Sequence, residues 1–322
     1  MDAAVEVLKK SGAAKAEKKA ARIAAEGIAK VAIDGNTAVV VEVNSETDFV
    51  AKNAIFQEFV QAVADKALTV DTEKAGEDVV SILDMKADLD DKILKIGEKI
   101  SIRRFEKVTA DVVASYIHGG GRIGVLVAGN GASDDAAKEA LTNIAMQVAA
   151  MNPQYISRND ISAEELAKIK EITIDSALND PFSLPKPVLS KLIEKAVAGV
   201  WSAEDVAIYE EKKSNMNFLP NFLSKEAKAQ LAEIACADKE EISGNKIFSG
   251  LVEGRISKQM KEICLLDQGY VKAEDGKQTV AAYLKSVNPA LKIAKFVRFE
   301  VGEGIEKKEE NFAEEVAAQM KQ

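Results

Sequence analysis

The sequence has only two cysteines, one histidine and no long apolar run among its 322 residues. Cys236, Cys264 and His118 cannot supply the roughly four nitrogen or sulfur ligands of a structural zinc site, so no metal is expected. No stretch approaches the ~18 apolar residues that span a bilayer, and residues 1–30 lack the apolar segment and cleavage pattern of a signal peptide. These absences predict a cytoplasmic protein with reduced thiols and no membrane contact.

The sequence also has fewer positive than negative charges. Lys and Arg number 43 against 52 Asp and Glu, which gives a net charge of −9. Because affinity for a phosphate backbone comes from a basic field, direct nucleic-acid binding is not expected. Residues 9–22 are locally basic but carry no aromatic side chain for base stacking. This segment, within a predicted helix over residues 3–25, is interpreted as a solvated helix face or as an edge for an acidic partner.

The sequence offers no constellation of side chains for catalysis. His118 stands beside Gly119, Gly120 and Gly121, and a glycine run can cradle phosphate. However, no helix start and no Lys-Ser/Thr pair follow it, so the run is interpreted as a hairpin turn. The carboxylates are scattered over predicted helix faces rather than paired for acid–base chemistry. We therefore expect a protein that is not an enzyme and uses no cofactor.

The strongest structural pattern is a hairpin, a helix and a strand that occur twice. Asp34-Gly35-Asn36 between two β-rich runs, residues 28–33 and 37–43, is typical of a hairpin. A helical spacing of apolar residues over 53–68, an acidic helix and loop over 71–95 and a strand over 99–105 follow. The same order then recurs, with strands at 112–117 and 123–128, a helix at 134–151 and a distant strand at 293–301. This recurrence indicates two related subdomains that arose by duplication.

A long insertion separates the last two elements of the second repeat. It carries all six prolines, which punctuate helices predicted at 162–178, 187–199, 202–213, 224–236 and 250–263. Ser162 with Glu165, and Ser202 with Asp205, are spaced as capping boxes. The predicted fold class is α+β: two related subdomains, each a small antiparallel sheet packed by helices, with an inserted coiled-coil-like helical arm and a C-terminal helix. The predicted segments are an N-terminal helical remnant (1–26), core subdomain N (27–110), the first part of core subdomain C (111–175), the arm (176–244), the completion of subdomain C (245–301) and a C-terminal helical module (302–322).

An aromatic residue, Phe49, lies in the otherwise polar turn that follows the first predicted hairpin. One interpretation is that it caps the core beneath the next helix as a hydrophobic staple. The other is that it is an exposed aromatic anchor of the kind that dominates protein–protein affinity. Spacing alone leaves both interpretations open.

The same turn carries a resemblance to a known family. The run Thr47-Asp48-Phe49-Val50-Ala51-Lys52-Asn53 is similar to the signature of bacterial translation elongation factor Ts. Further segments resemble that family in the same order, over about residues 4–175 and 245–322. They include residues 10–16, 96–100 with Arg103 and Arg104, 116–127, 144–146, 251–255 and 298–307.

The resemblance implies guanine nucleotide exchange on elongation factor Tu. In the family, Thr47, Asp48, Phe49 and Val50 would wedge into the nucleotide domain of Tu and dislodge its magnesium ion. Because Mg²⁺ bridges the nucleotide phosphates to the GTPase, its displacement would weaken GDP binding. Tu in its GDP-bound and nucleotide-free forms is the implied partner. The further contacts implied by the resemblance are Ile123 and Gly124, Gln147, and Phe312 and Val316 of the tail helix.

The sequence departs from the family pattern at three places. The Thr-Gly-Ala-Gly-Met-Met-Asp-Cys run is absent, which implies that most of the family's ubiquitin-associated-like N-terminal domain is missing. Gln147 stands where the family has a histidine, and residues 176–244 are longer than the usual helical hairpin. These departures keep a second hypothesis open, a helical scaffold or interaction protein on the same fold that does not exchange nucleotide.

Overall fold

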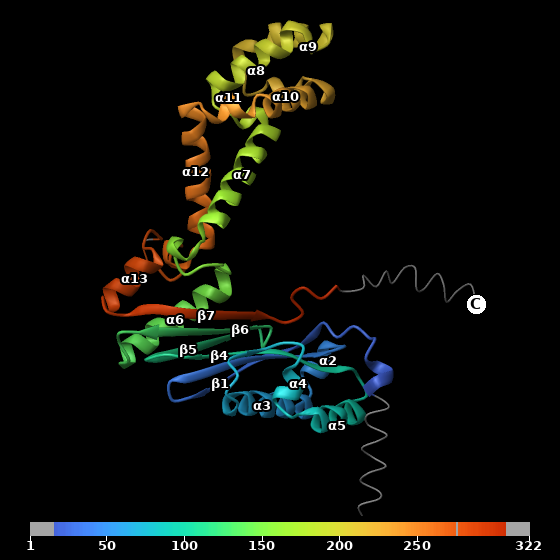
Figure 1. The fold of residues 1–322 in the computed structure, drawn as a ribbon, viewed down its shortest axis with the longest axis vertical. Coiled ribbons are helices and arrows are strands. Elements are labelled where there is room, and N and C mark those ends of the chain that lie inside the picture. Colours follow the sequence, from blue (N-terminus) through green and yellow to red (C-terminus); the bar gives the residue numbers. More distant parts are fainter. Residues whose placement is uncertain (1–15, 275, 307–322) are drawn as a thin grey trace, which may run out of the picture. The chain divides into compact units, whose positions relative to one another are not determined.

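The computed structural model describes residues 16–274 and 276–306, which form two compact units (Figure 1). The first unit combines the chain up to Ile156 with the chain from Gly269 onward, and the second is Ser157–Gln268. Helices and small antiparallel sheets make up the first unit, so the predicted α+β class is confirmed. The predicted arm, 176–244, lies inside the second unit.

A four-stranded antiparallel sheet with the order β1-β2-β4-β3 forms half of the first unit. Strand β1 (Glu26–Asp34) pairs with β2 (Thr37–Ser45), and Asp34 opposite Thr37 closes a two-residue turn. Gly35 in this turn has φ 57°, a left-handed conformation that glycine adopts without strain. The predicted hairpin is confirmed. Strand β4 (Ile100–Thr109) runs four residues beyond the predicted end because it pairs with β2 along its whole length, and β3 (Lys74–Ala75) is short.

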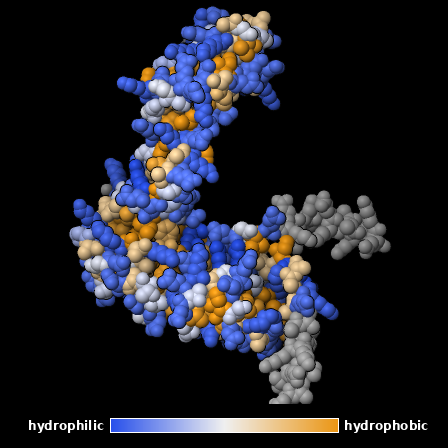
Figure 2. Space-filling model, viewed as in Figure 1, coloured by the Kyte–Doolittle hydropathy of each residue, from blue (hydrophilic) through white to orange (hydrophobic). Residues whose placement is uncertain are grey.

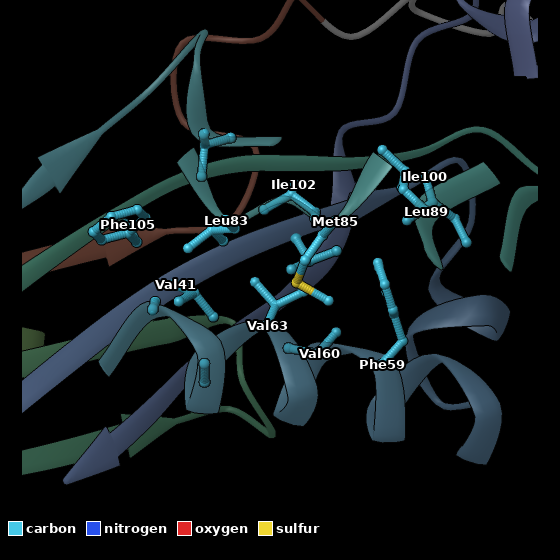
Figure 3. Packing of buried hydrophobic residues seen from close by; sticks show 14 of the residues in the cluster. Val41, Phe59, Val60, Val63, Leu83, Met85, Leu89, Ile100, Ile102 and Phe105 are labelled. Carbon is cyan, nitrogen blue, oxygen red and sulfur yellow. The ribbon is translucent and has the colours of Figure 1, made fainter. Parts of the chain in front are cut away.

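Helices cover one face of this sheet. The predicted central helix is confirmed as α3 (Ala54–Thr69), with α4 (Val79–Ile82) and α5 (Lys86–Ile96) beside it. Figure 3 shows Phe59, Val60 and Val63 of α3 pointing toward strand residues, with Leu83 and Met85 filling the space between. The alternation of buried and exposed positions on α3 follows from its i, i+3, i+4 apolar spacing.

The second sheet repeats the topology of the first. Its order is β5-β6-β7, from Val112–His118, Ile123–Asn130 and Lys292–Glu300, and α6 (Asp135–Met151) follows its hairpin. In both sheets a hairpin is followed by a helix and by a strand that pairs antiparallel with the second hairpin strand. The predicted duplication therefore describes the observed topology. Helix α13 (Val280–Val287), which the sequence analysis did not predict, precedes β7.

The two sheets of the first unit lie next to one another (Figure 1) and share a hydrophobic layer. Ala29, Ala38 and Val40 from the first sheet belong to the same buried cluster as Leu126 and Phe299 from the second. The small side chains on β1 and β2 allow the two sheets to approach closely.

The second unit is helical and has a core of its own. Its α-helices are α7 (Ala163–Asn179), α8 (Lys186–Gly199), α9 (Ala203–Lys212), α10 (Lys225–Ala237), α11 (Lys239–Ser243) and α12 (Lys246–Ile263). The Ser162–Glu165 capping box is confirmed. Ser202 caps α9, but Asp205 also accepts hydrogen bonds from the backbone N–H and hydroxyl of Ser224, the N-cap of α10. The Asp205 carboxylate therefore connects the starts of two helices. Helix α11 and the first turn of α12 were not predicted from the sequence.

Two predicted helices fall largely outside the described residues. The basic helix predicted over residues 3–25 shows a short helical stretch at 16–19, and residues 1–15 are not described. The C-terminal helix, including Phe312 and Val316, lies wholly outside the described residues.

Candidate partner-binding site

The turn after β2 presents one aromatic side chain to solvent. It forms a single helical turn, α2 (Asp48–Ala51), in which Phe49 is 79% exposed and Val50 is 9% exposed. Val50 belongs to the hydrophobic cluster beneath α3, whereas Phe49 does not. The staple interpretation of Phe49 is therefore wrong, because its neighbour Val50 fills the core position.

Capping hydrogen bonds explain why the chain turns here. Thr47 is the N-cap of α2, and its hydroxyl oxygen accepts a hydrogen bond from the backbone N–H of Val50 at 3.4 Å. The Ser45 hydroxyl donates to the Thr47 carbonyl oxygen at 3.0 Å. Asn53 caps the next helix by accepting from the N–H of Ile55 at 2.8 Å. Short polar side chains that bond to nearby backbone groups are the usual means of starting a helix.

The exposed turn also carries a pair of opposite charges. Lys52 donates to a carboxylate oxygen of Asp48 at 2.7 Å, and its ammonium lies 6.0 Å from the centre of the Phe49 ring. The hydrogen bond from Lys52 holds the pKa of the Asp48 carboxyl below its usual value. Asp48 is therefore ionised at neutral pH. The surface of α2 thus combines an aromatic ring, a carboxylate and an ammonium group.

Two further candidate residues lie on β6. Ile123 is half-buried, and Gly124 is buried where the two sheets meet. A Cβ atom on Gly124 would lie 3.0 Å from a methyl carbon of Ala29 and 3.0 Å from one of Val40. Gly124 therefore permits close packing of the sheets, and of this pair only Ile123 offers side-chain surface.

Comparison with known proteins assigns the chain to a family. A model of the family described as "Elongation factor TS" matches residues 46–212 and 214–303. The chain belongs to the elongation factor Ts family. It is similar to the protein named "Elongation factor Ts" of Clostridioides difficile (strain 630), with 40% identity over 331 aligned positions covering 100% of this chain and 89% of that protein. Membership places the chain among the factors of translation elongation.

Gln147 stands at a position where the family resemblance predicted a partner contact. Its side chain is fully buried on α6. The amide nitrogen donates to the Gly269 carbonyl oxygen at 3.0 Å, and the amide oxygen accepts from the N–H of Val271 at 2.8 Å. In this family member Gln147 therefore holds the segment before α13 against α6 rather than forming exposed surface.

A buried charge cluster was missed by the sequence analysis. Glu42 on β2 is fully buried and accepts hydrogen bonds from Arg103 at 2.8 Å and Arg104 at 2.6 Å. Its Oε1 atom also accepts from the N–H of Gly302 at 2.9 Å, and Arg104 pairs with Glu303 at 3.2 Å. The cluster therefore attaches the chain after β7 to the first sheet. The indication of this cluster in the sequence was a single carboxylate, Glu42, among the valines of residues 39–43, because a charge in a buried strand needs partners.

The pKa of the Glu42 carboxyl lies below its ordinary value. Burial alone would raise it, but the hydrogen bonds from Gly302 and Arg103 and the charge of Arg104 outweigh burial. Glu42 is therefore a buried anion with four hydrogen-bond donors around it: Arg103, Arg104, the N–H of Gly302 and the side-chain amide of Asn44.

The glycine turn after β5 is engaged within the chain. The N–H of Gly121 donates to the His118 carbonyl oxygen at 3.3 Å, and the Gly121 carbonyl accepts from the N–H of Ala29 at 2.7 Å. His118 lies 3.2 Å from the Tyr116 hydroxyl through Nδ1. The predicted hairpin turn is confirmed.

The described residues contain no group of three or more His, Cys, Asp or Glu side chains placed to hold a metal ion. Within the same residues, no helix combines the length and apolar character needed to cross a bilayer.

Because Gly124 is packed between sheets, enlarging it should destabilise the fold. We expect Gly124→Val to lower the free energy of unfolding by about 1–3 kcal/mol, the usual cost of overpacking. Gly254→Ala is the control, since Gly254 lies within α12 with no neighbouring atom near the added methyl group, and should raise stability by up to about 1 kcal/mol. Urea denaturation measures both. Unchanged stability of Gly124→Val would contradict the packing role.

Proposed function

We propose that the chain is a guanine nucleotide exchange factor for elongation factor Tu and acts in the cytoplasm. The observation that supports this most directly is Phe49, a large apolar side chain that is 79% exposed on a capped turn. Exposing an aromatic ring to water has no benefit to the free protein, and aromatic residues are frequent among the side chains that dominate interface energies. Family membership supplies the partner.

In the proposed mechanism α2 enters the nucleotide-binding domain of Tu near its magnesium ion. Phe49 contributes buried apolar area, and the ionised Asp48 alters the charge around the magnesium site. Displacing Mg²⁺ removes the bridge between the nucleotide phosphates and the GTPase, so GDP leaves faster. At equilibrium the chain and GDP weaken each other's binding to Tu by the same factor. The chain itself contributes binding surface and makes or breaks no covalent bond.

Release of a fluorescent GDP analogue from Tu, followed by stopped flow, tests the proposal. Micromolar chain should accelerate release well above the spontaneous rate. Raising the Mg²⁺ concentration should oppose this acceleration, because ion and chain favour opposite states of Tu. The control is Tu with the Phe49→Ala chain at the same concentration. Tight binding of the wild-type chain without any acceleration would contradict exchange and favour the non-exchanging scaffold.

A further inference from the structure

The helix that carries Phe49 is too short to hold its own shape. Helix α2 has four residues, whereas isolated helices below about 12–15 residues are marginal in water. Its position must therefore come from attachments to the rest of the first unit. Val50 in the core provides one attachment, the Gln57 side chain of α3 donates to the Ala51 carbonyl oxygen at 3.3 Å, and Thr47 provides a third attachment.

Thr47 is held by the half-buried Glu98, which lies between α5 and β4, far from Thr47 in the sequence. Its hydroxyl donates to Oε1 of Glu98 at 2.8 Å, and its backbone N–H donates to Oε2 at 3.1 Å. Both oxygens of one carboxylate thus bind one residue. Hydrogen bonds to an ionised acceptor are roughly twice as strong as neutral ones.

Glu98 is itself placed by regular structure on both sides. Gly97, with φ 88°, ends α5 in a left-handed C-cap, and β4 begins at Ile100. The carboxylate therefore projects from a short link between two elements that pack in the core. This gives Thr47 a support that does not move independently of the sheet.

The contact is reciprocal. Glu46, the neighbour of Thr47, accepts a hydrogen bond from the backbone N–H of Lys99 at 2.5 Å and pairs with Arg22 at 3.3 Å. The segments 46–47 and 98–99 therefore exchange hydrogen bonds in both directions. Because Thr47 is the N-cap of α2, fixing Thr47 fixes the direction of the helix and of the Phe49 side chain.

We propose that Glu98 is a positioning residue for Phe49, whose carboxylate holds α2 in the orientation that the partner meets. The inference rests on the proposed exchange function. A carboxylate is required because Thr47 presents two donors, whereas a glutamine amide has one acceptor oxygen and would turn its NH₂ group toward the second donor.

A double-mutant cycle on nucleotide release from Tu tests this. Glu98→Gln should slow catalysed release by about 10- to 100-fold, the loss expected when a contact group is misplaced by about 1 Å. In a chain that already carries Phe49→Ala, adding Glu98→Gln should cause no further loss, because there is no ring left to position. The exposed Glu77 provides the control, and Glu77→Gln should release GDP at the wild-type rate.

Thr47 allows the same comparison from the other side of the contact. In the free chain, Thr47→Ser keeps both donors and should leave the amide exchange of residues 46–52 at the wild-type rate, whereas Thr47→Val loses the hydroxyl and should speed this exchange as Glu98→Gln does. This pair also serves if Glu98→Gln melts early. Independent, multiplying effects of Glu98→Gln and Phe49→Ala would overturn the proposal, as would a wild-type rate for Glu98→Gln.

Hydrogen exchange of the free chain separates this inference from the proposed function. In Glu98→Gln, amides of residues 46–52 should exchange faster than in wild type while the rest of the first unit is unchanged. If the wild-type chain fails to release GDP, the exchange function is wrong, yet faster amide exchange would still support Glu98 as the support of α2. Unchanged amide exchange would overturn the inference whatever the activity.

Discussion

Phe49→Ala is expected to leave the free protein as stable as the wild type and to remove most of its exchange activity. The side chain is 79% exposed, so its loss leaves no cavity and little apolar area is returned to water. In the complex, loss of an aromatic anchor should weaken Tu binding by about 2 kcal/mol or more. Thermal melting of the free chain and titration against nucleotide-free Tu measure the two quantities.

Phe56 is the matched control for this prediction. It lies on α3, seven positions further along the chain, and is fully buried. Phe56→Ala should lower the free energy of unfolding by about 3–5 kcal/mol, while the folded fraction exchanges GDP at the wild-type rate. The wedge proposal fails if Phe49→Ala behaves like Phe56→Ala, with early melting and normal release from the folded molecules.

Glu42→Gln should be among the most destabilising single changes in the first unit. The substitution keeps the shape of the side chain but removes the negative charge that faces Arg103 and Arg104. Breaking a buried ion pair from one side costs about 3–5 kcal/mol, because the remaining charges lose their partner. Urea denaturation measures the loss. The exposed Glu77→Gln should stay within about 0.5 kcal/mol of wild type.

The pH dependence of the stability difference between wild type and Glu42→Gln shows whether loss of the negative charge causes the destabilisation. The pKa of Glu42 is lowered in the folded protein from an ordinary value of 4.5, so the carboxyl binds its proton more readily when unfolded. Its contribution to stability is therefore complete above pH 4.5 and is lost as the pH falls through the folded pKa. We expect the difference in the free energy of unfolding between wild type and Glu42→Gln to be constant around neutral pH and to become smaller below pH 4.5. A gap that is the same at all pH values would assign the loss to packing.

The surface of the first unit shows why the exposure of Phe49 was hard to predict from the sequence. Figure 2 shows hydrophobic residues at the surface over α3 and α4 among mainly hydrophilic neighbours. Ile55, in the first turn of α3, is 45% exposed, whereas Phe56 beside it is fully buried. Helical spacing separates these two because successive residues point in different directions. In the four-residue α2, helical spacing is too short a pattern to tell which side chain is exposed.

Elements predicted by local chemistry agree well with the structure. Asp34-Gly35 predicted the first hairpin, and repetition of the hairpin, helix and strand predicted β7 far along the chain. Ser162 and Glu165 predicted the start of α7. The eight-residue α13 and five-residue α11 were missed because helices of only about one to two turns carry little periodicity.

Local sequence determined the hairpins, the long helices and the caps, since these depend on residues within a few positions of one another. The exposure of Phe49, the burial of Gln147 and the partners of Glu42 were decided only by the tertiary structure. Each depends on contacts between distant segments: Thr47 with Glu98, Gln147 with Gly269, and Glu42 with Gly302. A polar side chain can be buried only where such a partner meets it, and the sequence near the side chain does not specify that partner.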